Sequence, residues 1–270
     1  LAKAGEVGFL GPNRSPRLVP LAPLRPGAPV MVVSHGIGGD PCNQEILIKE
    51  AQARGNQVYV MCYDTYSEGG STLSDGFARE LKGLGASGVK DVTVVAHSLG
   101  ALTMKAALAK LAGSDGKVQG FDHIRYVALS APWGGVNVAN AALWLLTGSP
   151  QLAFARDLAP GSAYWQGLIE TPIPGNVDFY NVQGDMDQFS ALAWGKQMAA
   201  NRQAVLAEAK RTLTLPRGTH NSPMWDPASL DFIFDPEHAP APAGPADTMH
   251  GAIAREVIAC LGKREAFRPK

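Results

Sequence analysis

Ser98 stands between an apolar strand pattern and an alanine-rich helix pattern. Residues 91–96 read DVTVVA, and residues 99–111 continue as a helix. A tight turn from strand to helix would expose the serine hydroxyl above the sheet, and free N–H groups at the helix start would favour an oxyanion. Small residues, Ala96 and Gly100, stand on either side, where such a turn is crowded. We predict that Ser98 is a nucleophile; the alternative is a serine that only caps the helix.

A glycine-rich loop follows the first central strand pattern. Residues 34–39 read SHGIGG. Glycines at a strand end let the backbone turn an N–H group towards a ligand. A plain turn or a phosphate loop is the alternative, but the segment lacks the lysine of a phosphate loop and the spacing of a dinucleotide fingerprint.

Together these motifs resemble the bacterial lipases of the α/β-hydrolase fold, and the small Bacillus-type lipases are the nearest in HGIGG and VVAHSLGA. The similarity covers about residues 28–135, including LSAPWGG, and is weak beyond them. The resemblance implies ester hydrolysis through an acyl-enzyme, without a cofactor. It also implies that the oxyanion hole is formed by the N–H groups of Ile37 and Leu99.

The acid of a catalytic triad is expected after the next strand pattern, because chain order in this fold is Ser, then Asp or Glu, then His. Residues 177–183 form that pattern and are followed by Gly184-Asp185-Met186-Asp187. We predict Asp187 as the acid. Asp185 is the alternative, although it is equally typical of a turn residue.

Two histidines compete as the base. His220 follows the strand pattern 211–215, where the base of this fold normally lies, whereas His250 begins the last helix pattern. We predict His220 and keep His250 as the alternative. His35 and His97 belong to the two motifs and are expected to be structural neighbours of the site.

The alternation of apolar strands with helices predicts one α/β domain over residues 1–270, with a mostly parallel sheet and helices on both faces. The insertion before strand 177–183 is rich in tryptophan and leucine, so residues 136–175 are either a small apolar cap or a helix packed on the core. The predicted strands are residues 30–34, 57–62, 91–96, 123–130, 177–183 and 211–215. The predicted helices are residues 43–54, 73–84, 99–111, 191–210, 227–234 and 251–261.

Charge and cysteine content limit the function classes. Twenty-four basic residues balance 24 acidic ones, which argues against nucleic-acid binding by bulk charge. No apolar run reaches the roughly 18 residues of a membrane helix. The three cysteines, Cys42, Cys62 and Cys260, lack the short spacings of a zinc site, and we consider a Cys42–Cys62 disulfide. Since the sequence begins at Leu1, we expect that a leader or tag was removed, and a secreted or periplasmic location is favoured over a cytoplasmic one.

The sequence therefore predicts a serine carboxylic-ester hydrolase, a lipase or esterase that takes apolar acyl esters and needs no metal or other cofactor. The expected partner is a small-molecule or lipid ester, with transient contact to a lipid surface. Alternatives are a thioesterase or phospholipase with the same machinery, or a non-catalytic binding protein of the same fold.

Overall fold

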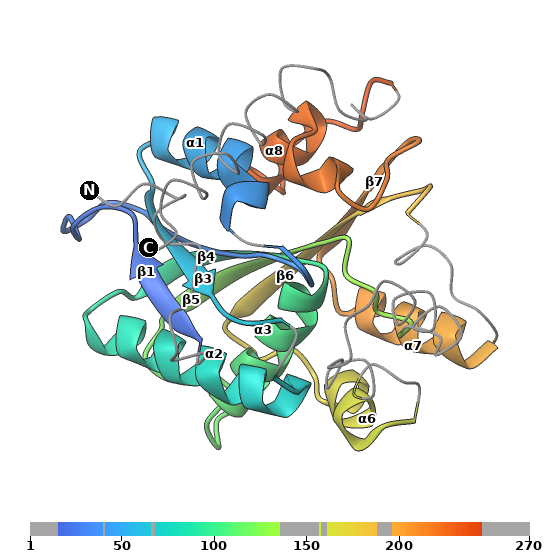
Figure 1. The fold of residues 1–270 in the computed structure, drawn as a ribbon, viewed down its shortest axis with the longest axis horizontal. Helices are drawn as coiled ribbons and strands as arrows, with labels where there is room; N and C mark the ends of the chain where they lie inside the picture. The colour runs from blue at the N-terminus through green and yellow to red at the C-terminus, as the bar shows by residue number, and fades with distance from the viewer. Residues whose placement is uncertain are drawn as a thin grey trace, which may run out of the picture.

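The computed structural model describes residues 16–39, 41–65, 68–135, 157, 161–187 and 196–244. Within these residues the chain forms a seven-stranded sheet in the order β1-β3-β2-β4-β5-β6-β7 (Figure 1). Strand β1 pairs antiparallel to β3, and every other pair is parallel. The strands are β1 (Arg17–Pro20), β2 (Val30–Ser34), β3 (Gln57–Cys62), β4 (Asp91–His97), β5 (His123–Leu129), β6 (Val177–Gly184) and β7 (Arg211–Leu215).

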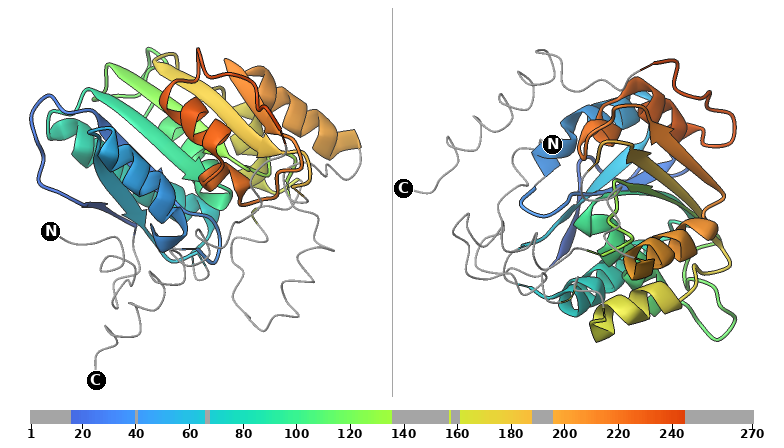
Figure 2. Two further views of the ribbon diagram at one scale, coloured as in Figure 1. Left: turned by 90° about the horizontal axis from the view of Figure 1, so that it is seen from above. Right: turned by 90° about the vertical axis from the view of Figure 1, so that its right-hand side faces the viewer.

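Helices cover both faces of the sheet. Helices α1 and α8 lie on one face, and α2, α3, α6 and α7 lie on the other (Figures 1 and 2). The helical elements are η2 (Pro41–Gln44), α1 (Glu45–Ala53), α2 (Gly70–Ala86), α3 (Leu99–Lys110), α6 (Ala163–Glu170), α7 (Lys196–Ala207), η3 (Ser222–Met224) and α8 (Pro227–Phe234).

The central strands are buried because both of their faces carry apolar side chains. In β4, Val92 and Val94 belong to the core under α2 and α3, whereas Val95 belongs to the core under α1 and α8. Strands that are apolar along their whole length are typical of a parallel sheet covered on both sides. The predicted fold class is confirmed.

Part of the predicted cap is an ordinary core helix. In α6, Trp165 and Leu168 are buried, and the helix contacts α3 and α7. The buried Lys105 of α3 donates to the carbonyl oxygens of Leu168 at 2.8 Å and Thr171 at 2.5 Å, which holds the end of α6 against α3. Residues 136–156 and 158–160 lie outside the described residues, so the cap itself remains a prediction.

The considered Cys42–Cys62 disulfide is wrong. Cys62 is a free, buried thiol at the end of β3, whereas Cys42 is disulfide-bonded. Cys42 lies in η2, eight residues beyond the end of β2, and not at a strand end beside Cys62. Cys260 lies outside the described residues. Burial raises the pKa of the Cys62 thiol to about 12, so this cysteine is unreactive at neutral pH.

Candidate active site

The candidate site lies where the strand order reverses. After β2 the chain adds β3 on one side of it and then returns to add β4 on the other side. The loops that leave the carboxyl ends of β2 and β4 therefore diverge, and this is where α/β sheets bind ligands. The glycine-rich loop at residues 35–39 and Ser98 both leave the sheet at this point.

Ser98 adopts a strained backbone conformation between β4 and α3. Its φ of 53° and ψ of −120° are unusual for a residue with a side chain. The Ser98 N–H donates to the Leu129 carbonyl at 2.8 Å, which fixes the turn against β5. The residue is 7% exposed, and its hydroxyl lies at the N-terminus of α3.

Two glycines allow the turn and the neighbouring loop to pack closely. A Cβ on Gly100 would lie 2.6 Å from Ser34 Oγ and 2.9 Å from Tyr63 Oη. A Cβ on Gly36 would lie 2.8 Å from the Ser98 Cβ. Cβ atoms in proteins essentially never lie this close to other heavy atoms. The glycine-rich loop can therefore pack against Ser98 only because residues 36 and 100 are glycines.

Three side chains from two other segments hold the glycine-rich loop. The buried Tyr63 stacks on His35 with ring centroids 4.2 Å apart, and its hydroxyl donates to the His35 carbonyl. Thr65 Oγ1 accepts from the Gly38 N–H at 3.0 Å, and Gln44 Nε2 donates to the Ser34 carbonyl at 2.9 Å. Within the described part of the chain, the N–H groups of Ile37 and Leu99 donate no hydrogen bond, so both are available to an oxyanion.

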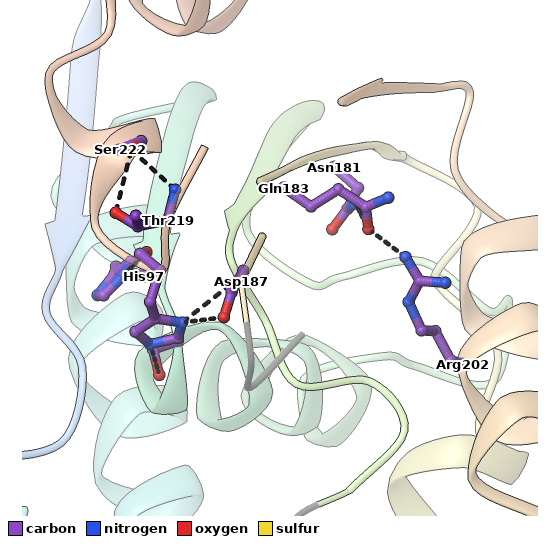
Figure 3. Close-up of polar contacts among 9 residues, drawn as sticks. His97, Asn181, Gln183, Asp187, Arg202, Thr219 and Ser222 are labelled. Atoms are coloured by element: carbon purple, nitrogen blue, oxygen red, sulfur yellow. Dashed lines mark hydrogen bonds and ion pairs between the residues drawn. The ribbon is translucent and has the colours of Figure 1, made fainter. Parts of the chain in front are cut away.

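The structure brings Ser98, His220 and Asp187 into one hydrogen-bonded row. His220 Nε2 lies 2.9 Å from Ser98 Oγ, and His220 Nδ1 lies 2.9 Å and 3.0 Å from the two Asp187 carboxylate oxygens. A carboxylate only accepts, so the neutral ring carries its proton on Nδ1 and accepts the Ser98 proton on Nε2. Asp187 is fully buried. Figure 3 shows Asp187 and its contacts.

Two loops carry the acid and the base: residues 185–187 after β6 (the acid loop) and residues 216–221 after β7 (the base loop). They meet at two glycines. A Cβ on Gly184 would collide with the backbone of Gly218. This close approach lets the Met186 N–H donate to the Gly218 carbonyl at 3.0 Å, and the Asp185 N–H donate to the Leu215 carbonyl at 3.2 Å. The backbone after β6 is thereby fixed to the backbone after β7, which carries His220.

Polar contacts on either side support these two loops (Figure 3). Directly after the base loop, the buried Ser222 accepts from the Thr219 N–H at 3.0 Å. Beside the acid loop, Arg202 of α7 donates to Gln183 Oε1 of β6 at 2.7 Å. Helix α7 is thus tied to the strand that leads to Asp187.

The remaining candidates lie away from this row. Asp185 is exposed, and its carboxylate is not among the contacts of His220. His250 lies outside the described residues. His123 and His238 are surface residues that pair with Asp178 at 3.1 Å and Asp235 at 2.9 Å. Among the residues that the structure describes, there is no cluster of three or more metal-ligating side chains.

Sequence reasoning missed the residues that support the site. Tyr63, Thr65 and Gln44 hold the glycine-rich loop, and Gly218 receives the acid loop, yet none of them belongs to a motif. The available signal was position in the chain, since Tyr63 and Thr65 follow the strand next to β2.

No described helix is long and apolar enough to cross a membrane.

Comparison with solved structures gives the same fold at low sequence identity. A lipase of Bacillus licheniformis matches at 16% identity and a TM-score of 0.55, covering 76% of this chain and 91% of that one. A structure from a study of carboxylesterases of Nitrososphaera gargenis matches at 14% identity and a TM-score of 0.51, covering 79% of this chain and 90% of that one. A bromoperoxidase of Bacillus anthracis matches at 12% identity and a TM-score of 0.52, covering 82% and 92%. These neighbours differ in activity, so the likeness shows the fold alone.

Comparison by sequence identifies the family. No curated protein sequence matches the chain significantly. A family model described as "Alpha/beta hydrolase family" matches residues 30–231, from the first central strand into α8, and this range includes Ser98, Asp187 and His220. With the strand order and the turn at Ser98, this match shows that the chain belongs to the α/β-hydrolase family.

Proposed function

We propose that this protein is a serine hydrolase of carboxylic esters, with Ser98 as nucleophile, His220 as base and Asp187 as the orienting acid. The observation that carries the proposal is the row of hydrogen bonds from Ser98 Oγ through the His220 ring to Asp187, with donor–acceptor distances of 2.9 to 3.0 Å. A serine hydroxyl is a weak nucleophile unless a base within this distance takes its proton.

The first half of the reaction forms an acyl-enzyme. His220 Nε2 takes the Ser98 proton as Oγ attacks the ester carbonyl carbon, and the carbonyl oxygen becomes an oxyanion. The N–H groups of Ile37 and Leu99 stabilise that charge. The bond to the alcohol oxygen then breaks, and the alcohol leaves with the proton from His220.

The second half restores the enzyme. Water gives a proton to His220 as its oxygen attacks the acyl carbonyl, and Ser98 leaves with that proton while the carboxylic acid departs. Asp187 remains ionised and stabilises the imidazolium in both halves. A fully buried carboxylate suits this role, because it is shielded from water while it accepts two contacts from His220 Nδ1.

We propose apolar acyl esters as substrates, with transient contact to lipid surfaces. Met186, next to Asp187 in the chain, is 61% exposed, so a large apolar side chain is exposed beside the triad acid in sequence. Each buried methylene contributes about 0.8 kcal/mol, so two more methylenes should raise kcat/KM roughly tenfold. A series of p-nitrophenyl esters from acetate to hexanoate tests this; a flat or falling profile would contradict an apolar acyl pocket.

For localisation we propose a secreted or periplasmic protein. Cys42 is disulfide-bonded, and disulfides persist mainly in oxidising compartments. Fractionation of the cells that naturally produce the protein tests the proposal, and recovery in the cytoplasm alone would contradict it.

Labelling with a fluorophosphonate, followed by peptide mass spectrometry, tests the catalytic proposal. Only an activated serine reacts, so we expect one adduct, on Ser98. A non-catalytic binding protein would remain unlabelled. Parallel assays with p-nitrophenyl butyrate, an acyl-CoA thioester and phospholipid vesicles separate an esterase from a thioesterase or a phospholipase, which would share the adduct but differ in turnover.

A further inference from the structure

The His97 ring lies between the two loops that the proposed reaction uses. It is 5% exposed, and its Nε2 lies 3.0 Å from the main-chain carbonyl oxygen of His220. The His97 and His220 ring centroids are 4.8 Å apart. On the other side, a Cβ on Gly36 would lie 3.0 Å from His97 Nδ1. His97 therefore contacts the base loop and the glycine-rich loop at once.

The protonation state of His97 follows from its contacts. A carbonyl oxygen only accepts, so the hydrogen bond to His220 requires a proton on His97 Nε2. Burial, with the nearby His220 as a second cause, lowers the pKa of His97 to about 3. His97 is therefore a neutral donor over the pH range in which hydrolases of this kind work, and it adds no charge beside the base.

Two of the contacts that His220 makes act on different parts of the residue. Asp187 holds the side chain at Nδ1, and His97 holds the main-chain carbonyl. His220 lies in a loop after β7, outside regular structure, so its backbone has no ladder of strand hydrogen bonds to fix it. A displacement of a reacting group by about 1 Å costs up to about 100-fold in rate.

We propose that His97 is a positioning residue for the base: its Nε2–H holds the His220 carbonyl so that His220 Nε2 stays within hydrogen-bond distance of Ser98 Oγ. The inference rests on the proposed function. Because His97 precedes Ser98 directly, the loop that carries the base is anchored to the residue next to the nucleophile. The nucleophile and the anchor of the base are thereby adjacent residues, His97 and Ser98.

A pair of substitutions separates the donor from the ring. His97→Phe keeps an aromatic ring but cannot donate, whereas His97→Gln places an amide N–H near the position of the imidazole Nε2. We expect His97→Phe to lower kcat for p-nitrophenyl butyrate about 10- to 100-fold, with KM changed less than about twofold. We expect His97→Gln to recover most of that loss, to within about fivefold of the unchanged protein.

The unchanged protein is assayed and labelled first, so the two proposals fail separately. If it neither turns over esters nor reacts with the fluorophosphonate, the proposed function fails. If it is active and a folded His97→Phe keeps its kcat within about twofold, only the role of His97 is overturned. Equal losses in His97→Phe and His97→Gln would also overturn it, because the donor would then be irrelevant.

A spectroscopic measurement on the unchanged protein tests the same contact if a variant does not fold. Nitrogen-15 spectra of the histidine side chains report which ring nitrogen carries the proton. We expect His97 to be neutral and protonated on Nε2 at pH 7. An imidazolium, or a proton on Nδ1, would exclude the hydrogen bond to His220 and overturn the proposal.

Discussion

The ends of β4 and β5 are each followed by a serine with a positive φ. Ser98 has a φ of 53° and Ser130 a φ of 49°, both in the left-handed region that side chains rarely adopt. Each N–H donates at 2.8 Å to a carbonyl of the next strand, Leu129 for Ser98 and Val182 for Ser130. The two neighbouring parallel strands therefore end in residues with a similar φ and a similar hydrogen bond to the next strand.

What surrounds the two turns is different. Helix α3 starts directly after Ser98, and His220 Nε2 lies 2.9 Å from its hydroxyl. Ser130 is followed by Ala131 and Pro132, it is fully buried, and its hydroxyl has no hydrogen-bond partner in the described part of the chain. A positive φ at the carboxyl end of a strand is thus not sufficient for a nucleophile. A nucleophile requires in addition a base, a helix N-terminus and access for the substrate.

The comparison of the two serines predicts its largest effect on kcat. Ser98→Ala should be nearly inactive, whereas Ser130→Ala should remain active. Ser98→Ala should lower kcat for p-nitrophenyl butyrate about 10⁵-fold or more, since members of a triad act as a unit. Ser130→Ala should stay within about threefold of the unchanged protein, because its hydroxyl is fully buried and makes no hydrogen bond in the described part of the chain. A Ser98→Ala variant with ordinary turnover would refute the assignment of the nucleophile.

The base should matter nearly as much as the nucleophile. His220→Ala should lower kcat by a similar factor, about 10⁵-fold, because Ser98 then keeps its proton at neutral pH. The matched variant is His250→Ala, which should lose far less and mainly through KM. An inactive His250→Ala beside an active His220→Ala would show that the base was assigned to the wrong histidine.

The acid should have a smaller effect than the base. Asp187→Asn should lower kcat about 10³- to 10⁴-fold, because the amide favours the wrong His220 tautomer. Asp185→Asn should be nearly neutral, because its side chain is exposed. Steady-state kinetics on the two variants decide the matter, and comparable losses in both would contradict the assignment of Asp187.

Gly100 should show how closely the Ser98 turn is packed. Gly100→Ala should lower the free energy of unfolding by about 2 kcal/mol, because its Cβ would meet Ser34 Oγ at 2.6 Å. Gly83→Ala is the control in α2, where a Cβ has nothing within 4 Å, and it should stabilise by about 0.5 to 1 kcal/mol. Urea unfolding measures both. Equal effects would mean that the packing at Gly100 is loose.

The smallest effect should be that of Ser130→Ala on stability. Removal of a buried hydroxyl without a partner loses no hydrogen bond, so the free energy of unfolding should stay the same or rise by about 1 kcal/mol. A loss above about 2 kcal/mol would show that the Ser130 hydroxyl has a structural role that the comparison denies.

Local patterns made much of the site predictable. Ser98 lies in a turn that strand, turn and helix patterns define within about twenty residues, and the structure has that turn. Chain order then limited the acid to two aspartates and the base to two histidines. The position of each residue after its strand favoured Asp187 and His220. The sequence could not show that these side chains meet, because both members of each pair offer the same chemistry and the outcome depends on which side chain turns inwards.

The sequence by itself determined the α/β class, the turn at Ser98 and the short set of candidates for acid and base, because these depend on apolar periodicity and on residue order. The tertiary structure alone decided which of them meet. Asp187 reaches His220 because Gly184 and Gly218 let two loops touch, and His97 reaches a carbonyl 123 residues further along the chain. The state of the cysteines was likewise decided by the tertiary structure, since Cys42 lies in η2 beyond the end of β2 and Cys62 is a free, buried thiol. Contacts between distant segments depend on how those segments pack, and no local pattern records that.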